Sequence, residues 1–122
     1  GVQTCALPIL VGRPLSMLLL KENATVTICH TRTKDLPGTC QQAEILVAAA
    51  GKAKMLDDSY VGENTTVIDV GINVDENGKL CGDVAADTLE EKSGKLTPVP
   101  GGVGAVTTAV LAKHLVQAAL RK

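Results

Sequence analysis

The chain has 122 residues, a formal net charge of −1 and 45% hydrophobic residues. This length suits one domain, and the balance of charge and apolar content excludes a disordered chain and an electrostatic nucleic-acid binder. Tyr60 is the only aromatic residue, so the core must consist of Val, Ile, Leu and Ala, as in parallel sheets covered by helices. The four cysteines lack C-x-x-C spacing, which indicates free thiols in a reducing cytoplasm. No apolar run approaches the length of a membrane span, so we expect a soluble, cytoplasmic protein without membrane partners.

Strand and helix patterns alternate along the chain. In chain order we predict a helix over 15–22, a strand over 24–30, a loop with a short helix over 31–43, a strand over 44–51, one helical turn over 56–61, a strand over 65–73, a hairpin turn at Asn77-Gly78, a short helix over 86–94 and a helix over about 103–121. The last helix carries one apolar face, made of Thr108, Leu111, Ala112, Leu115 and Ala119. This order favours an open α/β sheet, in which ligands bind at the carboxyl ends of the strands.

The first predicted strand ends in a short polar segment, His30-Thr31-Arg32. In a dinucleotide-binding fold, an acidic residue near this point would hold the ribose 2′-hydroxyl of NAD. Hydroxyl and guanidinium groups stand here instead, and they suit a 2′-phosphate. A solvated surface loop explains the segment equally well, and His30 alone is better interpreted as a structural or stacking residue than as a general base.

Glycines follow the next two predicted strands, at Gly51 and Gly71. They would let a flat ring or a phosphate approach the backbone, although a plain turn also explains each one. Asp69 and Asp83 could form an acid/base pair. Because nothing in the sequence places them together, we interpret both as carboxylates that stabilise loops.

The stretch LTPVPGGVG (96–104) stands directly before the last helix. It is not a Gly-x-Gly-x-x-Gly fingerprint, because Thr107 occupies the third glycine position and no further strand follows the helix. It is not a phosphate loop either, since no Gly-Lys-Ser/Thr follows. A proline-stiffened loop with exposed backbone N–H groups remains, and these donors could face a bound ring or anion.

Several motifs occur together in a characteristic order: VGRP, ATVTICHTRT, AEILVAAAGK, VIDVGIN, GKLCGDV and TPVPGGVG followed by TTAVL. Over residues 10–122 the chain resembles the C-terminal nucleotide-binding domain of the bifunctional methylenetetrahydrofolate dehydrogenase/methenyltetrahydrofolate cyclohydrolases. The resemblance implies a Rossmann-like, mostly parallel sheet with flanking helices, NADP as cofactor, and a homodimer in the full-length protein. It also implies oxidation of 5,10-methylenetetrahydrofolate to the 5,10-methenyl form and hydrolysis of that product to 10-formyltetrahydrofolate.

The resemblance also assigns site residues. Thr31 matches the contact to the 2′-phosphate, with Arg32 as a helper, and Ile72 matches the backbone that meets the nicotinamide. The full set expected to bind the cofactor is Val11, Gly12, His30, Thr31, Arg32, Gly51, Ile72, Gly104 and Thr107. The set expected to border the folate is Pro100, Gly101, Gly102 and Val103. No catalytic residue is expected in this chain, because the family's catalytic side chains belong to an N-terminal domain, and no metal site is expected.

The N-terminal segment departs from the family pattern. The family carries a Gly-Arg-Ser turn for the cofactor pyrophosphate where this chain has Ala6, Leu7 and Pro8. Residues 1–9 look like a translated sequencing adaptor, so we expect a non-native segment, a first strand that is lost or replaced, an exposed sheet edge and marginal stability. Ala105-Val106 replaces the usual Pro-Met. A catalytically silent nucleotide-binding or interaction module remains the alternative function.

Overall fold

The computed structural model describes residues 2–6, 11–89 and 92–121. Its elements are β1 (Val2–Ala6), α1 (Gly12–Lys21), β2 (Val26–Cys29), α2 (Leu36–Gln41), β3 (Ile45–Ala49), the 3₁₀ turn η1 (Asp58–Tyr60), β4 (Thr66–Asp69), β5 (Asn73–Val74), β6 (Leu80–Cys81), α3 (Ala86–Leu89), β7 (Lys95–Leu96) and α4 (Val103–Leu120). A five-stranded sheet has the order β2-β1-β3-β4-β7, and β5 and β6 form a separate antiparallel hairpin. Every pairing in the larger sheet is parallel, which confirms the predicted fold class.

Most of the predicted elements are present, and local signals explain where they end. Pro14 lies in the first turn of α1, where its missing N–H costs no hydrogen bond. Asn23 follows the helix with φ of 63°, and Gly78 closes the predicted hairpin turn with φ of 77°. Strands β1 and β7 were not predicted, since β1 lies in the segment interpreted as non-native and β7 has only 2 residues.

The expectation was a first strand that is lost or replaced. A strand is present and central, so it is not lost and it leaves no exposed edge at this position. Val2 pairs with Val26 of β2 on one side and with Ile45 of β3 on the other. Because β1 is enclosed by two neighbours, the sheet edges are β2 and β7. The non-native origin of residues 1–9 stays a prediction.

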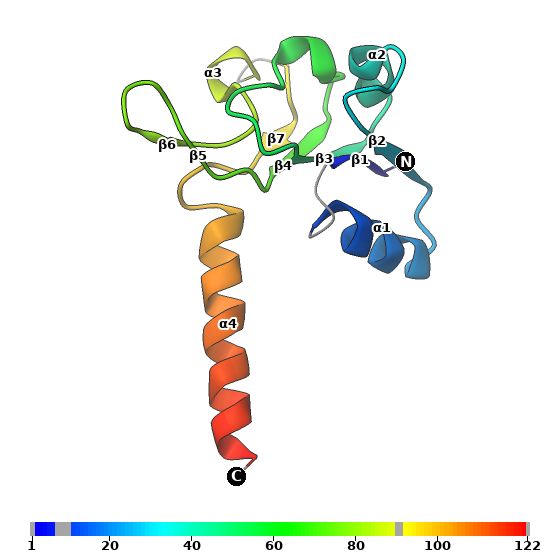
Figure 1. The fold of residues 1–122 in the computed structure, drawn as a ribbon. Coiled ribbons are helices and arrows are strands. Elements are labelled where there is room, and N and C mark those ends of the chain that lie inside the picture. Colours follow the sequence, from blue (N-terminus) through cyan, green and yellow to red (C-terminus); the bar gives the residue numbers. More distant parts are fainter. Residues whose placement is uncertain (1, 7–10, 90–91, 122) are drawn as a thin grey trace.

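One face of the sheet carries the core. In Figure 1, α2 and α3 lie above the sheet. The buried apolar side chains form one cluster with members from α2, β3, β4 and α3. The largest fully buried apolar members are Leu46, Leu56, Leu89, Val61 and Val67. Aliphatic residues fill this core as the composition predicts. Cys29 and Cys40 are buried, and Cys81 is a free, half-buried cysteine.

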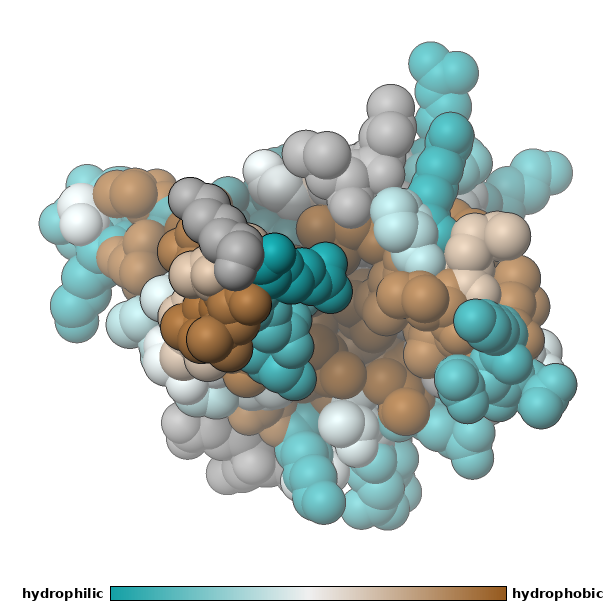
Figure 2. Space-filling view, turned by 90° about the horizontal axis from the view of Figure 1, so that it is seen from below, coloured by the Kyte–Doolittle hydropathy of each residue, from teal (hydrophilic) through white to brown (hydrophobic). Residues whose placement is uncertain are grey.

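The opposite face is only partly covered. Helix α1 lies beneath one side of the sheet, whereas α4 extends away from the body (Figure 1). Between them is an apolar groove of about 400 Å³, lined by Val11, Leu15, Leu19, Ile45, Val47, Ile68, Val70, Val103 and Thr107. Figure 2 views the molecule from this side, and hydrophobic residues occupy much of the surface.

Helix α4 differs from its prediction. None of its 18 residues is buried, so the apolar face expected to meet the core meets solvent instead. Among the described residues it is also the one helix that is long and apolar enough to cross a membrane, judged by length and composition only. This corrects the statement that no apolar run approaches that length. The apolar residues surround the helix rather than forming a single stripe, which is typical of a helix covered on several sides.

Candidate functional site

Most of the predicted cofactor residues follow the carboxyl ends of the parallel strands. Since β1 to β4 run parallel, their carboxyl ends face the same way. The segment from His30 follows β2, Gly51 follows β3 and Ile72 follows β4. Val11 and Gly12 begin α1, the helix that comes after β1. The pyrophosphate positions Leu7 and Pro8 lie outside the described residues, as does the Ala6 side chain.

The segment after β2 forms a compact polar turn. The His30 backbone N–H donates to Thr33 Oγ1 at 2.9 Å, and the Arg32 backbone N–H donates to His30 Nδ1 at 3.1 Å. The side chains of Thr31 and Arg32 are exposed. The next acidic residue, Asp35, accepts a hydrogen bond from the Gly38 N–H at 3.3 Å and caps α2. The turn therefore offers a guanidinium and hydroxyl groups, while the carboxylate that follows is engaged elsewhere.

Asp83 ties two strand ends together. Its Oδ2 accepts hydrogen bonds from the backbone N–H groups of Ala50 at 2.7 Å and Gly51 at 3.0 Å, directly after β3. Its Oδ1 accepts from Asn73 Nδ2 at 2.8 Å, beyond the end of β4. Gly51 itself is exposed, has φ of 71° and has open space where a Cβ would stand. Its Cα surface is thus accessible to a flat ligand.

Asp69 organises the neighbouring backbone. Its Oδ1 accepts from the N–H groups of Gly71 at 2.9 Å and Asp83 at 3.1 Å, and its Oδ2 accepts from the Val84 N–H at 3.1 Å. These bonds confirm that both aspartates stabilise loops. They also place the two aspartates side by side, which the sequence did not indicate.

Burial raises the pKa of Asp69 above its ordinary value of 3.8, and the charge of Asp83 raises it further. The three backbone N–H donors act in the opposite direction, because they favour the ionised form. Asp69 and Asp83 are 3% and 0% exposed. Both carboxylates are therefore occupied as acceptors inside the protein, which leaves them poorly placed to exchange protons with a substrate.

The PVPGG loop and the end of β4 enclose a cavity of about 420 Å³. Its lining residues are Asp69, Val70, Gly71, Ile72, Leu80, Pro98, Val99, Pro100, Gly101, Gly102, Gly104, Ala105 and Thr108. The Val99–Pro100 peptide bond is cis, and Gly101 has φ of 97°. A Cβ on Gly102 would overlap the carbonyl oxygen of Pro98. The unusual glycine and proline content of the stretch is thus explained by a tight backbone fold that shapes one wall of the cavity.

The structure divides the predicted site residues into groups. The cavity collects Ile72, Pro100, Gly101, Gly102 and Gly104. The apolar groove on the sheet's open face collects Val11, Val103 and Thr107. The remaining predicted residues line neither the cavity nor the groove and follow the carboxyl ends of β1, β2 and β3: Gly12, His30, Thr31, Arg32 and Gly51.

Some residues of the site were not predicted. Leu80 reaches the cavity from the β5–β6 hairpin, and Thr108 reaches it from α4. Thr97 Oγ1 accepts a hydrogen bond from the Asp69 backbone N–H at 2.9 Å, and the Asn73 side chain donates one to Asp83. A polar residue directly after a glycine-rich strand end was the available signal for Asn73. Leu80 offered none, because its role depends on how the hairpin folds back.

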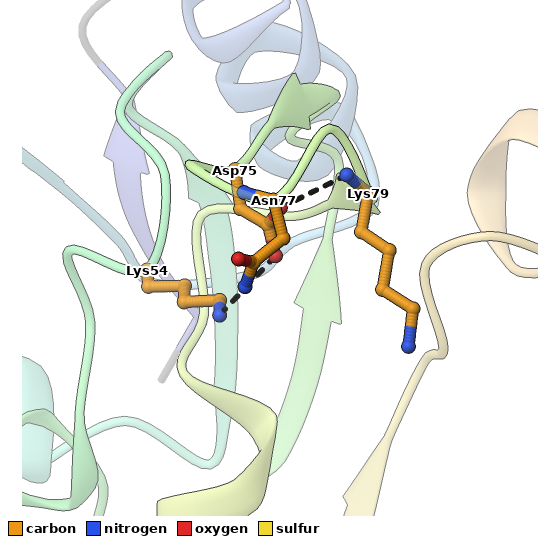
Figure 3. A network of polar contacts seen from close by, with 4 residues as sticks. All are labelled: Lys54, Asp75, Asn77 and Lys79. Atoms are coloured by element: carbon orange, nitrogen blue, oxygen red, sulfur yellow. Dashed lines mark hydrogen bonds and ion pairs between the residues drawn. The ribbon is translucent and has the colours of Figure 1, made fainter.

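The β5–β6 hairpin has a polar network of its own, which Figure 3 shows. Asp75 Oδ1 accepts from the N–H groups of Asn77 and Lys79, both at 2.9 Å. Asp75 Oδ2 lies 3.7 Å from Lys54 Nζ. The hydrogen bond from Lys79 is the main cause that lowers the pKa of Asp75, and the Lys54 charge adds to it. The hydrogen bonds stabilise the turn itself, and the ion pair ties the hairpin to Lys54 in the segment after β3.

With this geometry in place, comparison with known proteins identifies the domain. Residues 6–122 match the family described as tetrahydrofolate dehydrogenase/cyclohydrolase, NAD(P)-binding domain. The chain belongs to this family. The match begins at residue 6, ahead of the predicted domain start at residue 10, and it confirms the resemblance drawn from the motifs.

Relatives of this NAD(P)-binding domain are considerably longer than the chain. It is 60% identical over 111 residues to the bifunctional protein FolD of Clostridium botulinum (strain Okra / Type B1), covering 91% of the chain and 39% of that protein. It is 59% identical over 108 residues to the bifunctional protein FolD of Clostridioides difficile (strain 630), covering 88% and 38%. The chain thus spans about 39% of the length of its curated relatives.

Solved structures of the family share the fold. The bifunctional FolD enzyme of Campylobacter jejuni superposes with a TM-score of 0.90 at 42% identity, covering 98% of this chain and 43% of that one. The Trypanosoma brucei enzyme, described as complexed with NADP cofactor and inhibitor, gives a TM-score of 0.84 at 32% identity and covers 99% and 44%. The NAD(P)-binding domain of this family therefore has the Rossmann-like architecture that the sequence predicted.

Proposed function

We propose that this chain is the NADP-binding part of an enzyme that oxidises 5,10-methylenetetrahydrofolate and then hydrolyses the product. In the first reaction, a hydride leaves the methylene carbon and the 5,10-methenyl cation remains. In the second, water adds to that cation, a proton is released and 10-formyltetrahydrofolate forms. NADP, when bound, would supply the carbon that accepts the hydride.

One observation carries the proposal. The cavity of about 420 Å³ has the exposed Ile72 on one wall and the Pro100-Gly101-Gly102 turn on another. These are the positions expected for the nicotinamide and the folate respectively. Hydride transfer requires the two reacting carbons to lie roughly 3–3.5 Å apart, and a single cavity bordered by both sets of residues supports such an approach.

NADP is proposed over NAD because of the turn after β2. Arg32 and Thr31 are exposed there, and the carboxylate of Asp35 is engaged in capping α2. A guanidinium offers a planar pair of donors to phosphate oxygens, whereas NAD recognition would require a carboxylate for the ribose. Gly51 has open space at its Cα, which also fits a cofactor lying against the strand ends.

The chain's own residues would bind and orient rather than catalyse. The rigid loop from Pro98 to Gly102 would border the folate, and the backbone around Ile72 would support the nicotinamide. We propose that residues 10–122 form the cofactor domain, and that the folate-binding domain with the family's catalytic side chains lies outside it. The chain by itself would then bind cofactor without turning over substrate.

Further parts of this proposal concern partners and location. We propose a homodimer in the full-length protein, located in the cytoplasm, with no nucleic-acid or membrane partner. Exposed apolar side chains support a protein partner: Val74 on the β5–β6 hairpin is 66% exposed, and Leu115 on α4 is 64% exposed. The net charge of −1 offers no electrostatic attraction to nucleic acid.

Two measurements test the function. The first titrates the 122-residue chain with NADPH and NADH, following the fluorescence of the reduced nicotinamide, and we expect tighter binding of NADPH. The second joins the chain, with its central strand β1 retained, to the folate-binding part of the Clostridium botulinum relative and follows methenyltetrahydrofolate formation. Failure to bind either dinucleotide would overturn the proposal. Binding without turnover in the chimera would favour the alternative, a catalytically silent nucleotide-binding module.

A further inference from the structure

Two buried carboxylates join the strand ends that border the proposed cofactor site. Asp83 holds the N–H groups of Ala50 and Gly51 after β3 and the side chain of Asn73 after β4. Asp69 holds the N–H groups of Gly71, Asp83 and Val84. Asp83 thus connects segments that are distant in the sequence: it lies 32 residues from Gly51 and 10 residues from Asn73.

The backbone around these carboxylates has no spare room. A Cβ on Gly71 would overlap the Asp83 carboxyl group, and it would lie 2.6 Å from the Asp83 backbone nitrogen. A Cβ on Gly82 would overlap the Asp69 carboxyl group. Gly71 of VIDVGIN and Gly82 of GDV therefore leave room for a carboxylate: the absence of a Cβ lets Asp83 lie against Gly71 and Asp69 lie against Gly82.

We propose that Asp83, supported by Asp69, is a positioning residue of the dinucleotide site, because it sets the spacing between the Ala50-Gly51 turn and the Gly71-to-Asn73 segment. The inference rests on the proposed function and extends it to residues that contact no ligand. Gly51 and Ile72 are exposed, one in each of these two segments. Asp83 accepts a hydrogen bond from the Gly51 backbone N–H and another from Asn73, the residue next to Ile72.

The chemistry of the acceptor matters here. An ionised carboxylate accepts from all its partners at once, and hydrogen bonds to a charged acceptor are roughly twice as strong as neutral ones. An amide at position 83 would keep one oxygen but would add an NH₂ group. If that group faced the N–H groups of Ala50 and Gly51, a donor would oppose a donor. If it faced Asn73, the Asn73 amide would have to turn over and present its oxygen. In both cases neutral hydrogen bonds replace charge-assisted ones, and the two flanks are held less firmly.

The matched control is Asp75→Asn. Substitution at Asp75 removes the same charge as substitution at Asp83. The hydrogen bonds of Asp75 lie within its own turn, and its ion pair reaches Lys54, three residues beyond Gly51 (Figure 3). The rescue variant is Asn73→Asp combined with Asp83→Asn. There the amide oxygen at 83 accepts from Ala50 and Gly51 while its NH₂ donates to the new carboxylate at 73.

The experiment measures the dissociation constant for NADPH and the melting temperature of each full-chain variant. We expect Asp83→Asn to weaken NADPH binding by about 10-fold, the double variant to recover most of that loss, and Asp75→Asn to change binding by less than about 2-fold. A purely structural role would lower the melting temperatures of both single variants and leave the affinity of the folded fraction unchanged.

Each outcome has one meaning. Equal affinity of Asp83→Asn and the original chain overturns the inference while the proposed function stands, and so does an equal loss in Asp75→Asn. Absence of NADPH binding by the original chain overturns the proposed function and the inference with it. If Asp83→Asn does not fold, Asn73→Ala decides, because it removes a single hydrogen bond. A loss of about 3-fold supports the inference and unchanged affinity overturns it.

Discussion

Replacing Gly71 with alanine should destabilise the folded chain strongly. Gly71 is buried, and its added Cβ would overlap the Asp83 carboxyl group and lie 2.6 Å from the Asp83 backbone nitrogen. The backbone cannot yield cheaply, because Asp83 N–H and C=O are both engaged, with Asp69 Oδ1 and with Leu56 N–H. The carboxyl group must therefore move away from its partners.

The expected cost follows from those partners. Asp83 accepts hydrogen bonds from Ala50, Gly51 and Asn73, and each bond to this ionised acceptor is worth about 1.5–3 kcal/mol net. Losing two of them already removes about 3 kcal/mol or more from a stability expected to be about 5–15 kcal/mol. With a urea m-value of about 1.5–2 kcal/mol/M for a domain of this size, the denaturation midpoint should fall by at least about 1.5–2 M.

The assay is urea denaturation followed by far-UV circular dichroism, with Gly78→Ala as the control. Gly78 belongs to the β5–β6 turn, has φ of 77° and has no atom within 4 Å of an added Cβ. Its substitution costs only the left-handed backbone conformation, about 1–2 kcal/mol. If Gly71→Ala destabilises the chain no more than Gly78→Ala does, the close contact between Gly71 and Asp83 does not restrict the folded state and the reasoning is refuted.

Three further predictions concern cofactor choice, ionisation and the exposed helix. Arg32→Ala should weaken NADPH binding by about 10-fold or more and leave NADH binding unchanged, because only the 2′-phosphate pairs with the guanidinium; equal losses in fluorescence titrations would contradict this. Carboxyl-detected NMR should show Asp69 titrating above pH 3.8 and Asp75 below it. Because the folded pKa of Asp69 is raised, its contribution to stability is present below pH 3.8 and is lost as the pH rises through that folded pKa. Because the folded pKa of Asp75 is lowered, its contribution is present above pH 3.8 and is lost as the pH falls through that folded pKa. Replacing Leu111 and Leu115 with glutamate should reduce self-association in analytical ultracentrifugation without lowering the melting temperature, because they are 59% and 64% exposed; a large drop in melting temperature would show that α4 packs on the body.

We expect the chain to associate through exposed apolar surface and not through strand pairing. The exposed sheet edge expected from a missing first strand is wrong, because the structure places β1 between β2 and β3. The exposed apolar surface lies on α4 and in the groove beside α1. An apolar helix in water favours association with any surface that covers it, so the property follows from helix exposure and not from strand pairing.

The sequence by itself determined the elements and the chemistry available at their ends. The β-branched run before His30 predicts a strand, Asn77-Gly78 predicts a hairpin turn, and the glycines and prolines of the PVPGG loop predict a backbone that other residues cannot adopt. These signals are local, since each depends on the conformational preferences of a few neighbouring residues. They were sufficient to recognise the family and to predict a site at the strand ends.

Only the tertiary structure decided how those local pieces meet. It placed β1 at the centre of the sheet, brought Asp69 and Asp83 together, and divided the predicted residues between the cavity of Ile72 and the groove of Val11. It also left α4 exposed, although its sequence looks like that of a core helix. Strand pairing and burial depend on contacts between distant segments, and the same apolar residue is buried or exposed according to what lies against it.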